Sequence, residues 1–518
     1  MNFIRRSLLS RSLAVLLIWI ASPVVAQDEP PWQVVVQTED SRKVFVNSPS
    51  FAVLPNGHLL VSHLYYGDEI DREQAQVTHI QRSEDGGKTW AAVTKLEGIR
   101  WGNLFVVGDS VYLIGVERRY GRLLICKSTD NGTTWTKPDD SSGYLTNQKG
   151  YYTFRNSPEV IDGRVWTCVE RLIKGRFHMM VVSAPADADL LNANSWTKSN
   201  SLSLAKTSLG GKSDKVTEGN VLPGKDSVRI LSRLAKMGGE TASLATASAT
   251  DEGTMRFGLD RFVRFPGGGQ SFCVRFDAKE NCYWAVSNPQ SKPFSRNNRL
   301  AMLRSDDLLN WEIRYIPVSH EEGVWRGLTA PICRIDGDDL LIITNCAWGN
   351  TPGSGRADRI VFLRVAGFRN LSIADSPPIV SVDRTKKVDH ADFELTGSGY
   401  DLKNLEVGAD LFFAYRQFKW QDVPAEFQGW KFAMMLPTRD SNLKIDVKQN
   451  AQLYVAVAED QQPVDLTGWK PSSNALVYAD KRSKTVMRIF TRRVKAGEAL
   501  QIPQESWSGT VLLVPPDQ

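Results

Sequence analysis

Short apolar stretches separated by tight turns recur along most of the chain, and helical periodicity of any length is almost absent. The first clear unit has an apolar strand at Ser50 to Leu54, a Pro-Asn-Gly turn, a second strand at His58 to Leu64 and a third at Val77 to Arg82. Short apolar runs bounded by turn residues are typical of antiparallel strands. Comparable units begin near Leu104, Asn156, Asn220, Phe272 and Leu328. The pattern predicts six units, and a period of about 45 to 60 residues with four short strands is typical of a β-propeller.

Two of the units contain nearly the same turn. Residues 83–90 read SEDGGKTW and residues 128–135 read STDNGTTW, so both follow the pattern S-x-D-x-G-x-T-W. In such a turn the Asp and Ser oxygens accept backbone N–H groups, Gly takes a positive φ, and Trp covers a small apolar cluster. A weaker copy lies at 305–311, and Asn194-Ser195-Trp196 keeps only the end of the motif. The repetition indicates that the units are copies of one structural element.

The unit and its turn resemble the sialidase superfamily, in which this turn is called the Asp box or BNR repeat. The resemblance covers residues 33–375 and includes a subgroup of exported bacterial sialidase-like proteins. It implies an all-β chain with a six-bladed β-propeller over residues 27–375. The turn motif lies away from the active face in that superfamily and holds hairpins together. Asp85, Asp130 and Trp90 are therefore expected to be structural.

The repeat pattern ends at Asp375-Ser376-Pro377-Pro378, which is typical of a linker. Short alternating strands at 443–447, 452–456, 486–490 and 509–514 predict a β-sandwich over residues 376–518. This segment resembles accessory modules of secreted polysaccharide-degrading enzymes. Its tryptophans could stack on sugar rings or form the core of the sandwich; they are Trp420, Trp430, Trp469 and Trp507.

The first 26 residues have the features of an export signal. Three arginines precede an apolar run at 13–20, and Val24-Val25-Ala26 forms a small-residue cleavage site. We therefore expect the mature chain to begin near Gln27 and to be periplasmic or extracellular in a bacterium. No later segment approaches the about 18 consecutive apolar residues that a membrane-spanning helix needs.

Charge and cysteine content exclude several classes of protein. The 63 Lys and Arg against 58 Asp and Glu give a net charge of +5, or +2 without the three arginines of the first 26 residues. This balance argues against a polybasic nucleic-acid or membrane binder. The six cysteines form no C-x-x-C pair, so neither a zinc knuckle nor a redox motif is indicated. Cys273 and Cys282 could face each other across a hairpin, or all six cysteines could be buried thiols.

Strand direction predicts where side chains from different units meet. In each unit the first strand starts, and the second ends, at one rim, while the turn motif lies on the opposite face. The starts give Asn47, Arg100, Trp101, Arg155, Asn156, Glu218, Asn220, Trp325 and Arg326, and the ends give His63, Glu117, Arg118, Arg119, Glu170, Arg171, Arg233 and Trp348. Several guanidinium groups around one concavity suit an anionic sugar, because each holds a carboxylate through two charge-assisted hydrogen bonds. The alternative is that Arg and Glu simply pair with each other at a solvated rim.

The strongest local match to the superfamily is Thr217-Glu218-Gly219-Asn220 through Arg233. In the superfamily, a Glu before an inner strand polarises the nucleophile and an Arg at the end of the next strand binds the substrate carboxylate. The resemblance thus implies that Glu218 is the catalytic carboxylate and Arg233 a carboxylate ligand. His63 stands where sialidases have an acid/base Asp, and an imidazole with a pKa of about 6.5 can transfer protons at neutral pH.

Two positions depart from the superfamily pattern. The first Arg of the carboxylate-binding triad is missing, because the corresponding stretch is Val46-Asn47-Ser48-Pro49. The nucleophilic Tyr of the last blade is replaced by Trp325-Arg326-Gly327. The cation could come from Arg326, Arg155 or Arg275, and the phenol from Tyr65 or Tyr283.

Together these residues predict an exported, exo-acting, sialidase-like glycoside hydrolase on sialate- or uronate-bearing glycans. His63 and Glu218 are the expected catalytic groups; the expected substrate-binding residues are Asn47, Arg155, Glu170, Arg171, Asn220, Arg233, Arg275, Trp325 and Arg326. No metal or organic cofactor is implied, and the expected partner is an acidic oligo- or polysaccharide rather than nucleic acid. Two alternatives stay open. One is a uronate lyase in which His63 or a Tyr removes the proton α to a carboxylate that Arg neutralises, and the other is a glycan-binding protein without catalysis.

Overall fold

The computed structural model describes most of the chain after residue 31. The described residues are 32–139, 141–153, 155, 158–205, 209, 215–225, 227–235, 240–249, 254–290, 297–320, 327–348, 351, 353, 355–379, 386–398, 400–410, 418–435, 442–458, 465–479, 483–502 and 510–517. The expected export signal at residues 1–26 lies outside this set, as do Asn156, Trp325, Arg326 and Trp507.

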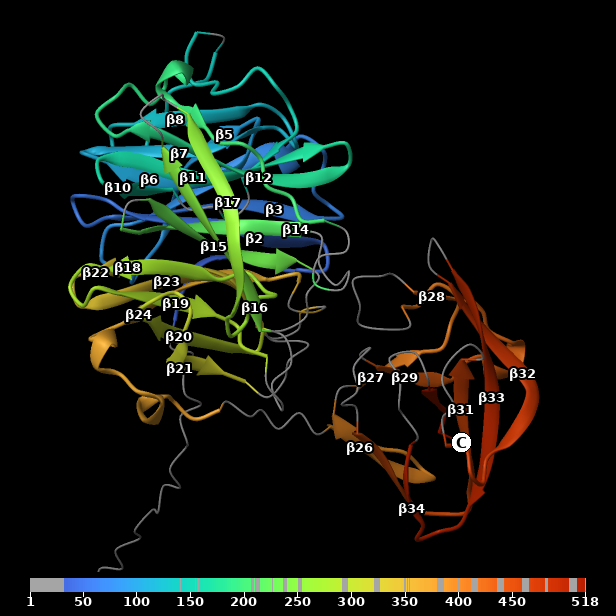
Figure 1. Cartoon of the computed structure of the whole chain (residues 1–518). Coiled ribbons are helices and arrows are strands. Elements are labelled where there is room, and N and C mark those ends of the chain that lie inside the picture. The colour runs from blue at the N-terminus through green and yellow to red at the C-terminus, as the bar shows by residue number, and fades with distance from the viewer. Residues whose placement is uncertain are drawn as a thin grey trace, which may run out of the picture. The chain divides into compact units, whose positions relative to one another are not determined.

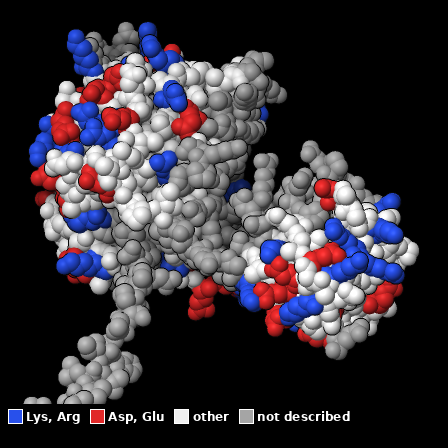
Figure 2. Space-filling view, turned by 90° about the horizontal axis from the view of Figure 1, so that it is seen from below, with Lys and Arg blue, Asp and Glu red and all other residues white. Residues whose placement is uncertain are grey.

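The described chain is all-β (Figure 1). Its helical residues are confined to the 3-10 turns η1 (Gln74–Gln76), η2 (Ala193–Ser195), η4 (Phe368–Asn370), η5 (Ile373–Asp375) and η6 (Ala425–Phe427). Among all the residues that the structure describes, no helix is long and apolar enough to cross a membrane. On the face seen in Figure 2, acidic and basic side chains are interspersed over the described surface, in keeping with the small net charge.

Six antiparallel sheets occupy the described residues between 33 and 365 (Figure 1). Their strands are β2 (Val44–Val53), β3 (Leu59–Gly67), β4 (Val77–Ser83) and β5 (Ala91–Glu97); β6 (Ile99–Val107), β7 (Ser110–Glu117) and β8 (Leu123–Ser128); β9 (Tyr151–Tyr152), β10 (Glu159–Ile161), β11 (Arg164–Ile173), β12 (Arg176–Pro185) and β13 (Thr197–Lys198); β14 (Lys215–Pro223), β15 (Val228–Ala235), β16 (Thr241–Ala249) and β17 (Met255–Arg264); β18 (Cys273–Asp277), β19 (Cys282–Ser287), β20 (Arg299–Ser305) and β21 (Glu312–Ser319); β22 (Gly327–Asp336), β23 (Asp339–Ala347) and β24 (Arg359–Val365) with β1 (Gln33–Gln37).

Burial differs between the first and last strands of a sheet. β6 and β14 are buried on both faces along most of their length, whereas β5 and β17 are largely exposed. Strands covered on both faces read as continuous apolar runs, and half-exposed strands alternate with polar residues. The apolar runs of the sequence therefore mark the strands that lie inside the structure.

Strands near the start of each sheet contact those of neighbouring sheets. β2 contacts both β6 and β22, and further contacts join β11 to β14, β14 to β18 and β18 to β22. Between β6 and the residue that follows β9, Thr153 Oγ1 donates a hydrogen bond to the Trp101 carbonyl at 2.8 Å. The N-terminal strand β1 completes the last sheet by pairing with β24, with Gln33 opposite Phe362. Through these contacts, strands that are far apart in the sequence and belong to different sheets lie next to one another.

The repeated turn has the same hydrogen bonds in each copy. In the first, Ser83 Oγ donates to Asp85 Oδ1 at 2.8 Å, and Asp85 Oδ1 accepts from the Thr89 N–H at 2.9 Å. Trp90 Nε1 closes the turn on the Gly87 carbonyl at 3.1 Å. The second copy repeats all of these bonds. In the weaker copy Leu308 takes the place of Gly with a φ of 64°. These carboxylates are engaged within their own turns.

Asp130 should make folding stability depend on pH in the acid range. The Thr134 hydroxyl and N–H donate to this carboxylate and hold its pKa at about 2. Because the folded-state pKa lies below the unfolded value of about 3.9, the contribution is present above about pH 4 and is lost as the pH falls through about 2. We expect the urea unfolding free energy of Asp130→Asn to fall less than that of wild type between pH 4 and 2.

Asp109→Asn is the matched control for this measurement. Its carboxylate has no hydrogen-bond donor among the residues that the structure describes, although it also lies in a turn between two strands. It should follow the wild-type pH dependence. Equal acid-side losses in wild type and Asp130→Asn would contradict the expected role of Asp130.

Two further sheets follow in the described residues after 385. Phe393, Ile445 and Leu512 belong to one core cluster, so the two sheets share a core. Trp420 is fully buried beside Phe432, which makes it a core residue. The strands are β25 (Lys386–Asp389), β26 (Phe393–Ser398), β30 (Asn442–Val447) and β34 (Ala499–Gln501), and β27 (Tyr400–Asn404), β28 (Lys419–Asp422), β29 (Lys431–Met435), β31 (Ala451–Ala458), β32 (Lys470–Ala479), β33 (Lys484–Val494) and β35 (Thr510–Val514).

The cysteines do not form the hairpin disulfide that the sequence allowed. β18 and β19 do form a hairpin, but its register pairs Cys273 with Val286 and Cys282 with Asp277. All six cysteines are buried free thiols. The Cys273–Cys282 pairing is therefore wrong, and the alternative of buried thiols is confirmed.

Candidate active site

Five of the six sheets carry a non-glycine residue with positive φ at the same place, near the start of the first strand. They are Ser48, Trp101, Arg155, Glu218 and Ala330, with φ between 55° and 60°. The β-ladders of four of these strands are interrupted there, between Asn47 and Ser50, Arg100 and Asn103, Thr217 and Gly219, and Thr329 and Ile332. Such a residue costs about 1–2 kcal/mol in the left-handed region, and a bulge re-aims its side chain. Backbone strain that recurs at the same place in five sheets marks the rim formed by these strand starts as a candidate site.

Glu218 lies between two guanidinium groups. Its Oε1 is 2.7 Å from Arg233 Nη1, and its Oε2 is 3.8 Å from Arg155 Nη1. The carboxylate is 4% exposed. Burial acts to raise the pKa of Glu218, but Arg233 and Arg155 outweigh it and hold this pKa below its ordinary value. Glu218 is therefore ionised at neutral pH.

Arg155 connects the cluster to the first and last sheets. Its Nη2 donates to Asn47 Oδ1 at 3.0 Å, and the same oxygen accepts from Asn345 Nδ2 at 2.9 Å. Arg155 Nη1 also bonds to the Ser271 hydroxyl. Residues from five of the six sheets, or from the loops beside them, thus surround this guanidinium group. Strand direction predicted that Asn47, Arg155, Glu218 and Arg233 would share one rim.

Two glycine positions allow the chain to pack this closely. A Cβ on Gly219 would lie 2.6 Å from Cys168 Sγ, so only glycine lets β11 approach β14 beside Glu218. A Cβ on Gly268 would lie 2.3 Å from the Thr241 carbonyl oxygen. The loop that contains Gly268 presents the Gly269 carbonyl to Arg233 Nε at 3.1 Å. These contacts fix the direction of the Arg233 side chain.

Glu170 is a second carboxyl group directly behind Glu218. Its Oε1 accepts hydrogen bonds from Thr217 Oγ1 at 2.6 Å and from the Glu218 N–H at 2.9 Å. Lys215 Nζ lies 3.7 Å from its Oε2. Complete burial nevertheless raises the pKa of Glu170 above its ordinary value. Two adjacent carboxyl groups whose pKa values move in opposite directions are the usual arrangement of an acid/base pair.

Tyr152 is a phenol at this site that the sequence analysis missed. Burial raises its pKa well above the ordinary value, and the nearby Glu170 and Glu218 raise it further. Its ring packs edge-on against Trp101, with 4.3 Å between centroids. The signal in the sequence was its place just before Arg155, at the start of the third unit.

Exposure decides which groups a ligand can meet. The Glu170 and Glu218 side chains are 0% and 4% exposed, whereas those of Arg233 and Lys215 are 24% and 25% exposed. The cations therefore cover the carboxyl groups. Arg155, Arg233 and Lys215 carry three positive charges against one negative charge from Glu218, so the cluster is positive whether Glu170 is protonated or ionised. An anionic ligand fits this face.

His63 does not contact this cluster among the residues that the structure describes. It is fully buried, 3.2 Å from Gln81 Nε2, and its ring packs against Tyr65 and His79. Burial and the neighbouring His79 lower the pKa of His63 to about 3. A neutral, inaccessible imidazole cannot donate a proton at neutral pH, so the structure gives no support to the expected acid/base role.

Several other expected residues are engaged elsewhere. The Asn220 amide bonds to the backbone of Leu231 and Val274 and thereby joins two sheets. Arg171 follows Glu170 on β11, so it points to the opposite face of the strand, where its Nε donates to the Lys149 carbonyl. Tyr283 donates its hydroxyl hydrogen to the Pro223 carbonyl at 3.0 Å.

Arg275 belongs to a separate buried cluster. Its Nε lies 3.3 Å from Glu159 Oε1, which also pairs with Arg334 Nη1 at 2.9 Å. Arg275 is only 5% exposed. Arg275 is therefore engaged with Glu159, whereas Arg155 lies beside Glu218; Arg326 lies outside the described residues.

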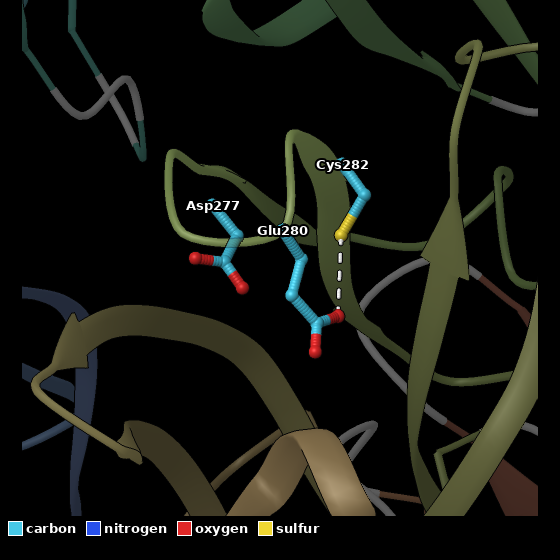
Figure 3. A group of neighbouring side chains, drawn as sticks. All are labelled: Asp277, Glu280 and Cys282. Atoms are coloured by element: carbon cyan, nitrogen blue, oxygen red, sulfur yellow. Dashed lines mark hydrogen bonds between the residues drawn. The ribbon is translucent and has the colours of Figure 1, made fainter.

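One group of side chains has the spacing of metal ligands among the described residues (Figure 3). Asp277, Glu280 and Cys282 lie on the β18–β19 hairpin with their ligand atoms within 4.8 Å of one another. Arg369, however, forms two bonds to the Asp277 carboxylate, at 2.6 and 2.9 Å. Cys282 Sγ lies 3.9 Å from Glu280 Oε2. A cation of the chain itself already neutralises this group.

No family model and no curated protein matches the chain. Among solved structures, a Hadza microbial sialidase is 14% identical, with a TM-score of 0.45 over 65% of this chain and 68% of the other. The Trypanosoma rangeli sialidase in complex with sialic acid is 10% identical, with a TM-score of 0.43 over 94% and 96%. An α-L-arabinofuranosidase from Fusarium graminearum is 12% identical, with a TM-score of 0.43 over 65% and 98%. Identities of 10–14% with TM-scores below 0.5 do not identify the reaction of this chain.

Proposed function

We propose that this protein is an exported glycoside hydrolase of sialidase-like type that acts at the ends of acidic glycans. The observation that carries the proposal is the group of three cations, Arg155, Arg233 and Lys215, around the buried carboxyl groups Glu170 and Glu218, with Tyr152 beside them. A phenol that bonds to the anomeric carbon needs a group that accepts its proton, and the ionised Glu218 can be that group. The excess of positive charge selects a sugar that carries a carboxylate.

We also propose that the chain folds as a six-bladed β-propeller over residues 27–375, followed by a β-sandwich over residues 376–518. The contacts between strands of neighbouring sheets and the pairing of β1 with β24 support the propeller. Every pairing between described strands stays within residues 33–365 or within 386–514, which supports a boundary near residue 376. Residues 1–26 serve as the export signal.

Each group has a defined task in the proposed reaction. Arg155 and Arg233 bind the substrate carboxylate, because both are partly exposed and their joint charge exceeds that of Glu218. Tyr152 is the group that meets the anomeric carbon. It lies in the electrostatic reach of both carboxyl groups. Its oxygen bonds to the anomeric carbon as the glycosidic bond breaks, and its proton passes to the ionised Glu218. The leaving oxygen takes a proton from water, the resulting hydroxide releases the sugar, and Tyr152 regains its proton from Glu218. Asn47 orients Arg155.

A uronate lyase is the second candidate, and the same Tyr152 favours it. A phenol beside two guanidinium groups can exchange a proton at the carbon α to a carboxylate, while the arginines stabilise the negative charge that develops there. This chemistry needs no second carboxyl group. A carboxylate that accepts the proton of the phenol is needed when Tyr152 bonds to the anomeric carbon, so the position of Glu218 beside Arg155 and Arg233 favours hydrolysis over elimination.

One assay separates these possibilities. The purified protein is incubated with sialate-bearing and uronate-bearing polysaccharides, with a neutral glucan as control, and both reducing sugar and ultraviolet absorbance of unsaturated uronate are followed. We expect release of reducing sugar from an acidic glycan without new absorbance. New absorbance would show a lyase, binding without either signal a glycan-binding protein, and turnover of the neutral glucan alone would overturn the proposal.

A further inference from the structure

A cationic cavity of about 410 Å³ lies beside the candidate active site. It is lined by side chains that include Arg72, Arg118, Arg119, Lys149, Glu117 and Tyr120. Four of these six residues are basic. Neither the carboxyl pair nor Tyr152 belongs to this lining, so the proposed reaction leaves the cavity without a role.

The charges of this cavity are only partly balanced. Arg122 forms two bonds to the Glu117 carboxylate, at 2.9 and 3.0 Å. Arg118 pairs with Glu73 at 2.8 Å. Arg72, Arg119 and Lys149, in contrast, have no carboxylate within ion-pair distance in the described part of the chain. Arg119 packs on the Tyr120 ring, with 5.1 Å between its guanidinium carbon and the ring centroid. Three cations that share one cavity without carboxylate partners among the described residues form a site for an oxyanion.

The turn that carries Arg119 is held in a strained conformation. Arg118 and Tyr120 have φ values of 54° and 60°, in the left-handed region. A Cβ on Gly121 would lie 1.6 Å from the Glu117 carbonyl oxygen, so only glycine closes this turn. The Gly150 N–H holds the turn through the Tyr120 carbonyl at 2.7 Å. Strain that the surrounding structure maintains is typical of ligand-binding segments.

An aromatic wall separates the cavity from the candidate active site. The Tyr120 ring lies 6.3 Å from that of Tyr152 and 5.5 Å from that of Trp101. The residues that hold the strained turn, Gly150 and Tyr151, directly precede Tyr152. A glycan whose reacting sugar lies at Tyr152 therefore places its next sugar near Tyr120.

We propose that this cavity binds a second oxyanion of the same glycan, a sulfate ester or a carboxylate on the sugar next to the reacting one. The proposal rests on the proposed function and narrows it: the preferred substrate is a polyanionic chain, rather than a glycan with a single acidic end. Arg72, Arg119 and Lys149 bind the oxyanion, and Tyr120 packs against the sugar ring.

The test is binding of a chondroitin sulfate tetrasaccharide to the full chain, measured by calorimetry. Wild type is compared with the double variant Arg119→Gln/Lys149→Gln. Loss of two charge-assisted contacts, at about 1.5 kcal/mol or more each, should weaken binding about 100-fold. The matched control is Lys88→Gln/Arg261→Gln, which removes two exposed cations that lie outside the cavity lining. It should bind as wild type does, and circular dichroism checks that both variants fold.

The desulfated and carboxyl-reduced forms of the tetrasaccharide show which oxyanion the cavity binds. Wild type and the cavity variant should bind with equal affinity the form that lacks this oxyanion. Inorganic sulfate should compete with the tetrasaccharide in wild type. Equal affinities of the two double variants would overturn the proposal, even if the protein hydrolyses acidic glycans. A persistent loss of affinity without turnover of any glycan would support the cavity and contradict the hydrolase.

Discussion

Glu218→Ala should lower the turnover number by about 10²–10⁴-fold and the free energy of unfolding by about 3 kcal/mol. The substitution removes the carboxylate that neutralises Arg155 and Arg233 and leaves both guanidinium groups close together. Breaking a buried ion pair from one side costs about 3–5 kcal/mol, and the lower end applies because Arg233 is partly exposed. Turnover of the acidic glycan and urea unfolding measure the two effects.

Two control variants show whether the effects of Glu218→Ala come from the lost charge, from the lost side-chain volume or from removing any carboxylate of a salt bridge. Glu218→Gln keeps the size of the side chain, so it should lose as much turnover as Glu218→Ala while avoiding part of the packing cost. Glu84→Ala removes the partner of Arg82 from an exposed salt bridge and should change the unfolding free energy by less than about 1 kcal/mol. If Glu218→Ala unfolds and turns over as wild type does, Glu218 is neither the centre of the ion cluster nor a catalytic group.

Tyr152→Phe should reduce the turnover number by about 10²–10⁴-fold with little change in substrate affinity. Only the hydroxyl group is removed, so the ring still packs against Trp101 and the cations still hold the substrate carboxylate. Steady-state kinetics on the acidic glycan separate the two parameters. Retained folding is expected, because the aromatic contacts of the ring remain.

Tyr283→Phe is the matched control for this loss. Its hydroxyl group bonds to the Pro223 carbonyl, and it is one of the phenols that the sequence suggested for the nucleophile. Turnover should be unchanged in Tyr283→Phe. A Tyr152→Phe variant as active as wild type would remove Tyr152 from the reaction and return the search to other phenols such as Tyr66, whose hydroxyl lies 2.8 Å from Ser48 Oγ.

Local patterns in the sequence were enough to predict the strands, the turns and one pair of the candidate site. Apolar runs and turn residues are properties of neighbouring positions, so the antiparallel sheets and the hydrogen bonds of the repeated turn could be expected. Glu218 and Arg233 lie on adjacent strands of one hairpin, where Thr217 pairs with Arg233. Their proximity therefore depends on the short-range register of one hairpin and on the bulge that contains Glu218.

Tertiary structure decided everything that depends on how separate sheets pack. Tyr152, Glu170 and Arg155 reach Glu218 from another sheet, and positive φ values re-aim the side chains of Arg155 and Glu218. No local pattern distinguishes a histidine at a rim from one sealed between two strands, as His63 is. The sequence by itself determined the repeated β-unit, because hairpins form between neighbours; only packing between distant segments decided which polar groups are buried, paired and shifted in pKa, because burial is a property of the whole fold.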